Sequence, residues 1–154
     1  MDYITYLRNM VGQEKVIMVV AGAFVLNDAN ELLLQKRKDN GEWGLPGGFM
    51  EMGESTEETA QREVFEETGL QLGELRLFRV YSGPEYDKTF ANGDQVALVQ
   101  VLYSCKGFTG VVIRSNNESA DNRFFSMNAL PHELFQEHVS LIRDFQQAIE
   151  IGEY

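Results

Sequence analysis

Residues 48–70 read GFMEMGESTEETAQREVFEETGL, and this stretch decides the fold prediction. Seven residues in it follow the spacing G-x5-E-x7-R-E-x-x-E-E-x-G, namely Gly48, Glu54, Arg62, Glu63, Glu66, Glu67 and Gly69. On a helix, residues three and four positions apart share one face, so the last three glutamates would lie side by side. Carboxylates placed so closely repel one another unless cations lie among them. Oxygen ligands suit Mg²⁺ or Mn²⁺, which in turn bind phosphates. The stretch therefore predicts a metal-dependent phosphate site.

This pattern resembles the signature of the Nudix hydrolases, without a gap or a substitution. The resemblance is tightest over residues 43–70. It implies an α/β fold, the Nudix α/β/α sandwich with a mixed sheet, in which residues 48–70 form a loop–helix–loop unit. It also implies an activity, the metal-dependent hydrolysis of a diphosphate bond in a nucleoside diphosphate linked to another group. Nucleotide sugars, ADP-ribose, dinucleoside polyphosphates and dNTPs are all open as substrates.

The resemblance also implies roles for single residues of the motif. The implied metal ligands are the carboxylates of Glu63, Glu66 and Glu67 and the backbone carbonyl of Gly47. Glu63 is the best candidate to orient or deprotonate the attacking water, although coupled carboxylates titrate as a cluster and leave the identity of the base open. We expect Arg62 to point away from Glu63 and to brace the motif loop through a charge-assisted hydrogen bond. Glu54 is expected to be structural.

In this family a further carboxylate for metal binding often comes from outside the motif helix. Glu118 lies in the segment NNESADNRFF, just before the last predicted strand, and is the first candidate for it. Asp94 and Glu85 are rivals on other loops.

Substrate contacts are expected outside the motif. By resemblance, Arg37 reaches the substrate phosphates. Residues 81–93 form a polar loop that contains glycine, and such loops commonly bind ligands. Tyr81 and Tyr86 in this loop are the first candidates to stack on a nucleobase, and Phe78 and Phe90 are further aromatic residues that could do so. Trp43, beside the motif, is expected to pack in the core instead.

Hydrophobic periodicity and turn residues predict the surrounding elements. The expected helices span residues 2–11, a segment that begins at the Ser55 cap and ends at Gly69, and residues 133–149. The expected strands are 16–26, 31–36 as the second arm of a hairpin, 74–81, 95–104, and shorter ones near 111–114 and 122–126. His132 and His138 lie at or on the last helix, where surface or packing roles are expected.

Size and charge set the broad class. A chain of 154 residues is long enough for one domain with a sizeable core, which we expect over residues 1–154. The net charge of −11 argues against polymeric nucleic acid or an anionic membrane as a partner. Metal ions would let such an acidic chain hold phosphates.

No signal peptide is evident, and the single cysteine, Cys105, suits a reducing cytosol, so we expect a cytoplasmic protein. The oligomeric state stays open, and a homodimer is common among Nudix proteins.

Two other readings come from different classes. A Nudix-fold module that binds or senses a nucleotide without turnover is the main alternative, and the complete set of motif glutamates argues against it. A calcium-binding EF-hand would need a D-x-[DN]-x-[DN]-G loop, which the chain lacks.

Overall fold

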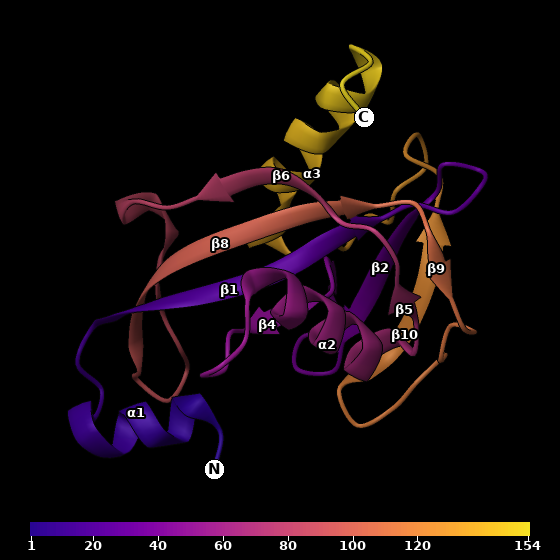
Figure 1. Cartoon of the computed structure of the whole chain (residues 1–154). Helices are drawn as coiled ribbons and strands as arrows, with labels where there is room; N and C mark the ends of the chain where they lie inside the picture. The colour runs from indigo at the N-terminus through magenta and orange to yellow at the C-terminus, as the bar shows by residue number, and fades with distance from the viewer.

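The computed structural model describes all residues, 1–154, as strands packed between helices (Figure 1). The helices are α1 (Tyr3–Val11), α2 (Thr56–Thr68) and α3 (Gln136–Glu150), with a 3-10 turn η1 (Pro84–Tyr86). The strands are β1 (Val16–Val25), β2 (Leu32–Arg37), β3 (Trp43–Gly44), β4 (Gly47–Phe49), β5 (Gln71–Leu72), β6 (Arg76–Tyr81), β7 (Asp87–Thr89), β8 (Gln95–Cys105), β9 (Phe108–Thr109) and β10 (Ser119–Phe125). No helix has both the length and the apolar character needed to cross a membrane.

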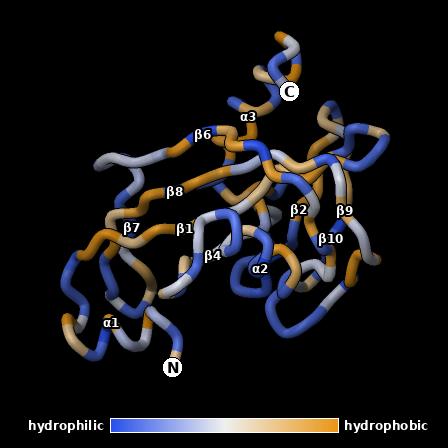
Figure 2. The backbone as a smooth tube through the Cα atoms, in the orientation of Figure 1, coloured by the Kyte–Doolittle hydropathy of each residue, from blue (hydrophilic) through white to orange (hydrophobic).

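A mixed sheet with the strand order β4–β1–β8–β6 forms the centre, and β7 extends it by pairing with β8. β1 and β8 are parallel along their whole length, from Val16 opposite Val96 to Val25 opposite Cys105. The other strands run antiparallel to their neighbours. Figure 2 shows that β1 and β8 are hydrophobic over most of their length, as expected for strands buried on both faces.

The alternation of side chains along β1 divides the core between two helices. Val25 points to the side of α2, where it belongs to one cluster with Val64. Phe24 points to the side of α3, and its ring stacks on Phe145 with the centroids 4.1 Å apart. The helices α2 and α3 thus cover opposite faces of the sheet (Figure 1), which confirms the predicted α/β/α sandwich.

The predicted hairpin of β1 and β2 is wrong. The two strands meet only at an isolated bridge between Leu26 and Leu32. Instead, β2 pairs with β10 and β3 in a second sheet. β8 pairs with one edge of β1 along its whole length and β4 with the other edge at Val20–Gly22, so β2 reaches β1 only through the bridge at Leu26.

The motif helix follows its sequence signals, whereas one predicted strand does not form. Ser55 and Glu58 form a capping box at the start of α2, and Gly69 ends the helix with a φ of 81°. The predicted strand at 111–114 is absent, and a short pair of β5 with β9 lies just before it. Gly110 turns the chain with a φ of 99°, and the Ile113 amide then donates to the Thr68 carbonyl instead of joining a sheet.

Candidate active site

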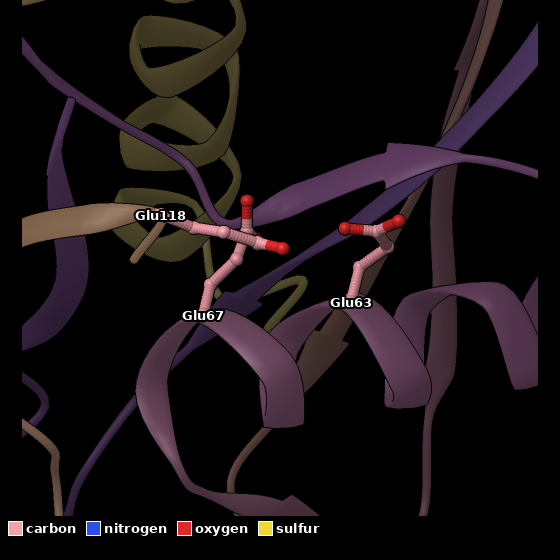
Figure 3. A group of neighbouring side chains, drawn as sticks. All are labelled: Glu63, Glu67 and Glu118. Carbon is pink, nitrogen blue, oxygen red and sulfur yellow. The ribbon is translucent and has the colours of Figure 1, made fainter. Parts of the chain in front are cut away.

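Three carboxylates from two distant segments meet beside the edge strand β4. Glu63 and Glu67 lie one turn apart on α2, and Glu118 stands just before β10. One carboxylate oxygen from each lies within 4.8 Å of the others. Figure 3 shows Glu63 and Glu67 rising from the same side of the helix, with Glu118 reaching toward Glu67 from a neighbouring segment.

Glu67 is the most buried member of this carboxylate cluster, with an exposed fraction of 8%. Its Oε1 accepts a hydrogen bond from the Gly47 amide at 2.8 Å. Burial, and next the charge of Glu63, raise the pKa of Glu67 well above its usual range. Burial also raises the pKa of Glu63, although Arg62 opposes that shift. Such a cluster is unfavourable on its own, and an all-oxygen donor set of this kind fits a hard divalent cation.

Arg62 connects the motif loop to the carboxylate cluster. Its Nε donates to Glu54 Oε2 at 2.5 Å and its Nη2 to the Phe49 carbonyl at 3.0 Å, so it braces the loop as expected. Its Nη1 also donates to Glu63 Oε1 at 2.9 Å, so the expectation that it points away from Glu63 is wrong. The guanidinium beside Glu54 lowers the pKa of that carboxyl to about 2. Glu54 is therefore ionised and holds Arg62 in place.

Glu66 and the two rival carboxylates lie outside the cluster. The exposed Glu66 is near Arg62, with Oε2 3.3 Å from Nη1, and it lines the adjacent cavity. Asp94 pairs with Arg8 at 3.5 Å, and Glu85 lies in η1. Of the three candidates outside the motif, Glu118 is the one that joins Glu63 and Glu67.

A cavity of about 750 Å³ opens beside the carboxylates, which is a suitable size for a nucleotide. Its floor is the part of β1 and β8 that α3 leaves uncovered, and its walls include residues of β4, β7, the β7–β8 connection, α1 and α2. The apolar lining includes Val20 and Leu98 on the floor, and Phe49, Phe90 and Ile4 on the walls.

Two cations that line the same cavity lie close to one aromatic ring. The guanidinium carbon of Arg37 lies 4.1 Å from the centroid of Phe135, and Nζ of Lys88 lies 5.0 Å from it. Arg37 was expected at the site, but Lys88 was not singled out from the sequence. Its place in the polar loop 81–93 was the available signal.

Tyr81 and Tyr86, the tyrosines expected to face the substrate, do not line this cavity. Tyr81 is buried in the core, and its hydroxyl donates to Asp144 Oδ2 at 2.8 Å. Tyr86 packs edge-on against it, with the ring centroids 5.8 Å apart. The loop 81–93 does reach the cavity, through Lys88 and Phe90.

His138, for which only a surface or packing role was expected, also lines the cavity. Its Nδ1 accepts a hydrogen bond from the Leu45 amide at 3.0 Å, so the ring hydrogen of the neutral form lies on Nε2. Burial, and then the positive charges of Arg37 and Lys88, lower the pKa of His138 to about 3. The side chain is therefore neutral at physiological pH. No local pattern in the sequence connects residues 45 and 138.

Comparison with known proteins agrees with this geometry. The family model of the NUDIX domain matches residues 16–145. The ADP-ribose pyrophosphatase of Methanocaldococcus jannaschii is 35% identical over 126 residues, which cover 80% of this chain and 70% of that protein. The nucleoside triphosphatase NudI of Escherichia coli is 30% identical over 115 residues, covering 70% of this chain and 81% of that one. The crystal structure of a MutT NUDIX hydrolase from Burkholderia pseudomallei superimposes with a TM-score of 0.68 at 28% identity, over 84% of this chain and 97% of that chain.

Proposed function

Because the chain belongs to the Nudix hydrolase family and is a hydrolase of diphosphate bonds, we propose that it is a metal-dependent pyrophosphohydrolase acting on a small nucleotide. The substrate would be a nucleoside diphosphate linked to another group, such as ADP-ribose, a nucleotide sugar, a dinucleoside polyphosphate or a dNTP. One observation carries the proposal: Glu63, Glu67 and Glu118 meet at the wall of a cavity that is large enough for a nucleotide.

The proposed metal is Mg²⁺ or Mn²⁺, and the proposed ligands are Glu63, Glu67 and Glu118, with Glu66 and the Gly47 carbonyl as further candidates. A donor set made only of oxygen atoms, one of them on a carboxylate that is largely removed from water, suits these hard cations. Bound metal would neutralise charge on the substrate phosphates and lower the pKa of coordinated water.

The side chains themselves have separate tasks in the proposed reaction. Water forms a new bond to one phosphorus while the bridging P–O bond breaks, and a carboxylate oxygen of Glu63 accepts the proton of that water. Arg62 holds this carboxylate at 2.9 Å and the motif loop at 3.0 Å, so it positions Glu63. Arg37 and Lys88 would attract the phosphates into the cavity. Little covalent work is left for the protein beyond positioning.

A substrate panel tests the proposal directly. Purified full-length chain is incubated with ADP-ribose, nucleotide sugars, dinucleoside polyphosphates, and ordinary and oxidised dNTPs, each with Mg²⁺ or Mn²⁺, and the products are identified. We expect turnover of at least one of them and loss of turnover in Glu63→Gln. The matched control is Glu74→Gln, since Glu74 is exposed and lies outside the cavity.

Two outcomes would contradict the proposal: no turnover of any compound, or full activity in Glu63→Gln. Nucleotide binding without cleavage would favour the alternative, a Nudix-fold module that senses a nucleotide.

Two features of the enzyme stay predictions: a cytoplasmic location and one domain over residues 1–154. The oligomeric state stays open, with a homodimer as one possibility. Sedimentation analysis tests the dimer, and limited proteolysis tests the domain, because a single domain should resist cleavage throughout residues 1–154.

A further inference from the structure

Gln100 is the only buried polar residue whose side chain forms no hydrogen bond within the protein. Eight polar residues are buried. Seven of them form side-chain hydrogen bonds, namely Gln35, Thr59, Glu67, Thr68, Ser104, Ser119 and Asn122. Gln100 has none, although its exposed fraction is only 8%. Its amide nitrogen and oxygen still reach the cavity that Gln100 lines, so their hydrogen-bond partner comes from that cavity, as water or as a bound ligand.

The position of Gln100 shows where this partner would lie. Gln100 is in the middle of β8, between Leu98 and Leu102, and all three residues line the cavity of the carboxylate cluster. Alternate residues of a strand share a face, so the amide stands on the cavity floor between two aliphatic side chains. In the sheet, Gln100 is paired with Val20 on one side and with Tyr81 on the other, and neither offers it a side-chain partner.

Part of the cavity that Gln100 lines suits a flat group with apolar faces. The rings of Phe49 and Phe90 line the same cavity, with centroids 6.3 Å apart and planes inclined by 56°. Ile4 of α1 lines it as well, from a helix that precedes the residues matched to the family. The aromatic and aliphatic part of this lining favours a planar ring, and the Gln100 amide in the same lining favours a ring with a hydrogen-bonding edge.

We infer that Gln100 determines substrate specificity by pairing its amide with the edge of a nucleobase. A glutamine amide presents a donor beside an acceptor, and a base edge that carries an acceptor beside a donor complements it. Adenine, with N6 and N7 side by side, is a base that glutamine pairs with through two hydrogen bonds. The inference rests on the proposed function, because it takes the phosphates to lie at the carboxylate cluster of the same cavity.

A binding experiment tests this role without requiring turnover. AMP, GMP, CMP, UMP and ribose 5-phosphate are titrated calorimetrically into the full chain with Mg²⁺ present. We expect at least one nucleotide to bind wild type about tenfold more tightly than ribose 5-phosphate. In Gln100→Leu the affinity for that nucleotide should fall about 5- to 150-fold, as for a lost bidentate pair. Ribose 5-phosphate, which has no base, should bind wild type and the variant within about twofold of each other.

Two further measurements separate recognition from a structural role. Without ligand, the melting temperature of Gln100→Leu should equal or exceed that of wild type, because leucine removes an unpartnered amide and joins Leu98 and Leu102. Gln100→Glu keeps the size of the side chain but replaces its donor, so it should lose the same nucleotide preference even if the leucine variant folds poorly. Gln71→Leu is the matched control, since Gln71 is exposed on β5 outside the cavity.

The inference is overturned if both Gln100 variants bind nucleotides as wild type does, or if no nucleotide binds wild type more tightly than ribose 5-phosphate. If nothing is hydrolysed but the variants lose nucleotide affinity, the proposed function fails while base recognition by Gln100 is supported. If nucleotides are hydrolysed and the variants keep the base preference of wild type, the inference fails and the proposed function stands.

Discussion

The carboxyl group of Glu63 lies in the space that a side chain at Gly48 would occupy. A Cβ on Gly48 would stand 2.3 Å from the carboxyl carbon of Glu63, and 2.5 and 2.6 Å from its two oxygens. Gly48 has no positive φ, so the backbone conformation does not require glycine there. Glycine is required because the Glu63 carboxylate fills this space, and the hydrogen bond from Arg62 Nη1 to Glu63 Oε1 holds it there.

The first prediction concerns this contact. Gly48→Ala should displace the Glu63 carboxylate and lower kcat/KM by about 10²-fold or more, since small misplacements of reacting groups have effects of that size. The fold should persist, because the atoms that must move are at the end of a side chain. Activity assays and melting curves check this, with Gly107→Ala as the control because no atom lies near a Cβ there. Wild-type activity in Gly48→Ala would disprove the positional role of this contact.

Arg62→Lys should lower both activity and stability. A lysine cannot bridge Glu54, the Phe49 carbonyl and Glu63 at the same time, because it lacks the planar guanidinium fork. The loss of charge-assisted hydrogen bonds should reduce the free energy of unfolding by about 1.5–3 kcal/mol, measured by urea denaturation. We expect kcat to fall more than KM rises. Arg123→Lys, at an exposed position of β10, serves as the control. An unchanged kcat in Arg62→Lys would argue that the loop holds Glu63 without this arginine.

Glu67→Gln should separate metal binding from folding stability. Glutamine can still accept the hydrogen bond from the Gly47 amide, but it removes a buried negative charge close to Glu63 and Glu118. Without metal, the variant should therefore melt at a higher temperature than wild type. Mn²⁺ should raise the melting temperature of wild type, because a ligand of the native state stabilises it, and should do so much less in the variant. Equal stabilisation of both proteins by Mn²⁺ would remove Glu67 from the proposed ligands.

His138 should contribute to the pH dependence of stability. Its pKa is lowered from 6.5 to about 3, so between these values the unfolded chain binds a proton that the folded chain does not. The neutral imidazole contributes fully to the free energy of unfolding above pH 6.5, and this contribution is lost progressively as the pH falls toward about 3. Between pH 7.5 and 5 the loss in the free energy of unfolding is about 2 kcal/mol.

The measurement is urea unfolding of wild type and His138→Asn at both pH values. The carboxylates titrate in both proteins, so the difference between the two pH slopes isolates the histidine. Between pH 7.5 and 5, the free energy of unfolding should fall less in His138→Asn than in wild type, whatever the stability of the variant at pH 7.5. Parallel slopes would show that His138 is protonated as easily in the folded state as in the unfolded state.

The sequence was most informative where the deciding interactions are local. Ser55 and Glu58, three positions apart, cap the start of α2, and Gly69 ends it. A spacing of four residues places Glu63 and Glu67 on one face of that helix. The sequence was least informative where segments that are distant along the chain meet. The predicted hairpin failed because the ladder partners of β1 are β4 and β8, and no turn signal after β1 reports which distant strands will pair with it.

By itself, the sequence determined the family, the motif helix and the positions of most of its acidic side chains, because these depend on contacts within one or two helical turns. The tertiary structure decided which other residues join them. It selected Glu118 over Asp94 and Glu85 and brought His138 to the Leu45 amide. At the cavity it kept Phe90, excluded Tyr81 and Tyr86, and added Lys88. It also left Gln100 on the cavity floor without a partner in the protein. The physical reason is that these arrangements follow from the pairing of β1 with β8 and from the part of the sheet that α3 leaves uncovered. Both are set by the packing of the whole chain, which no short stretch of sequence encodes.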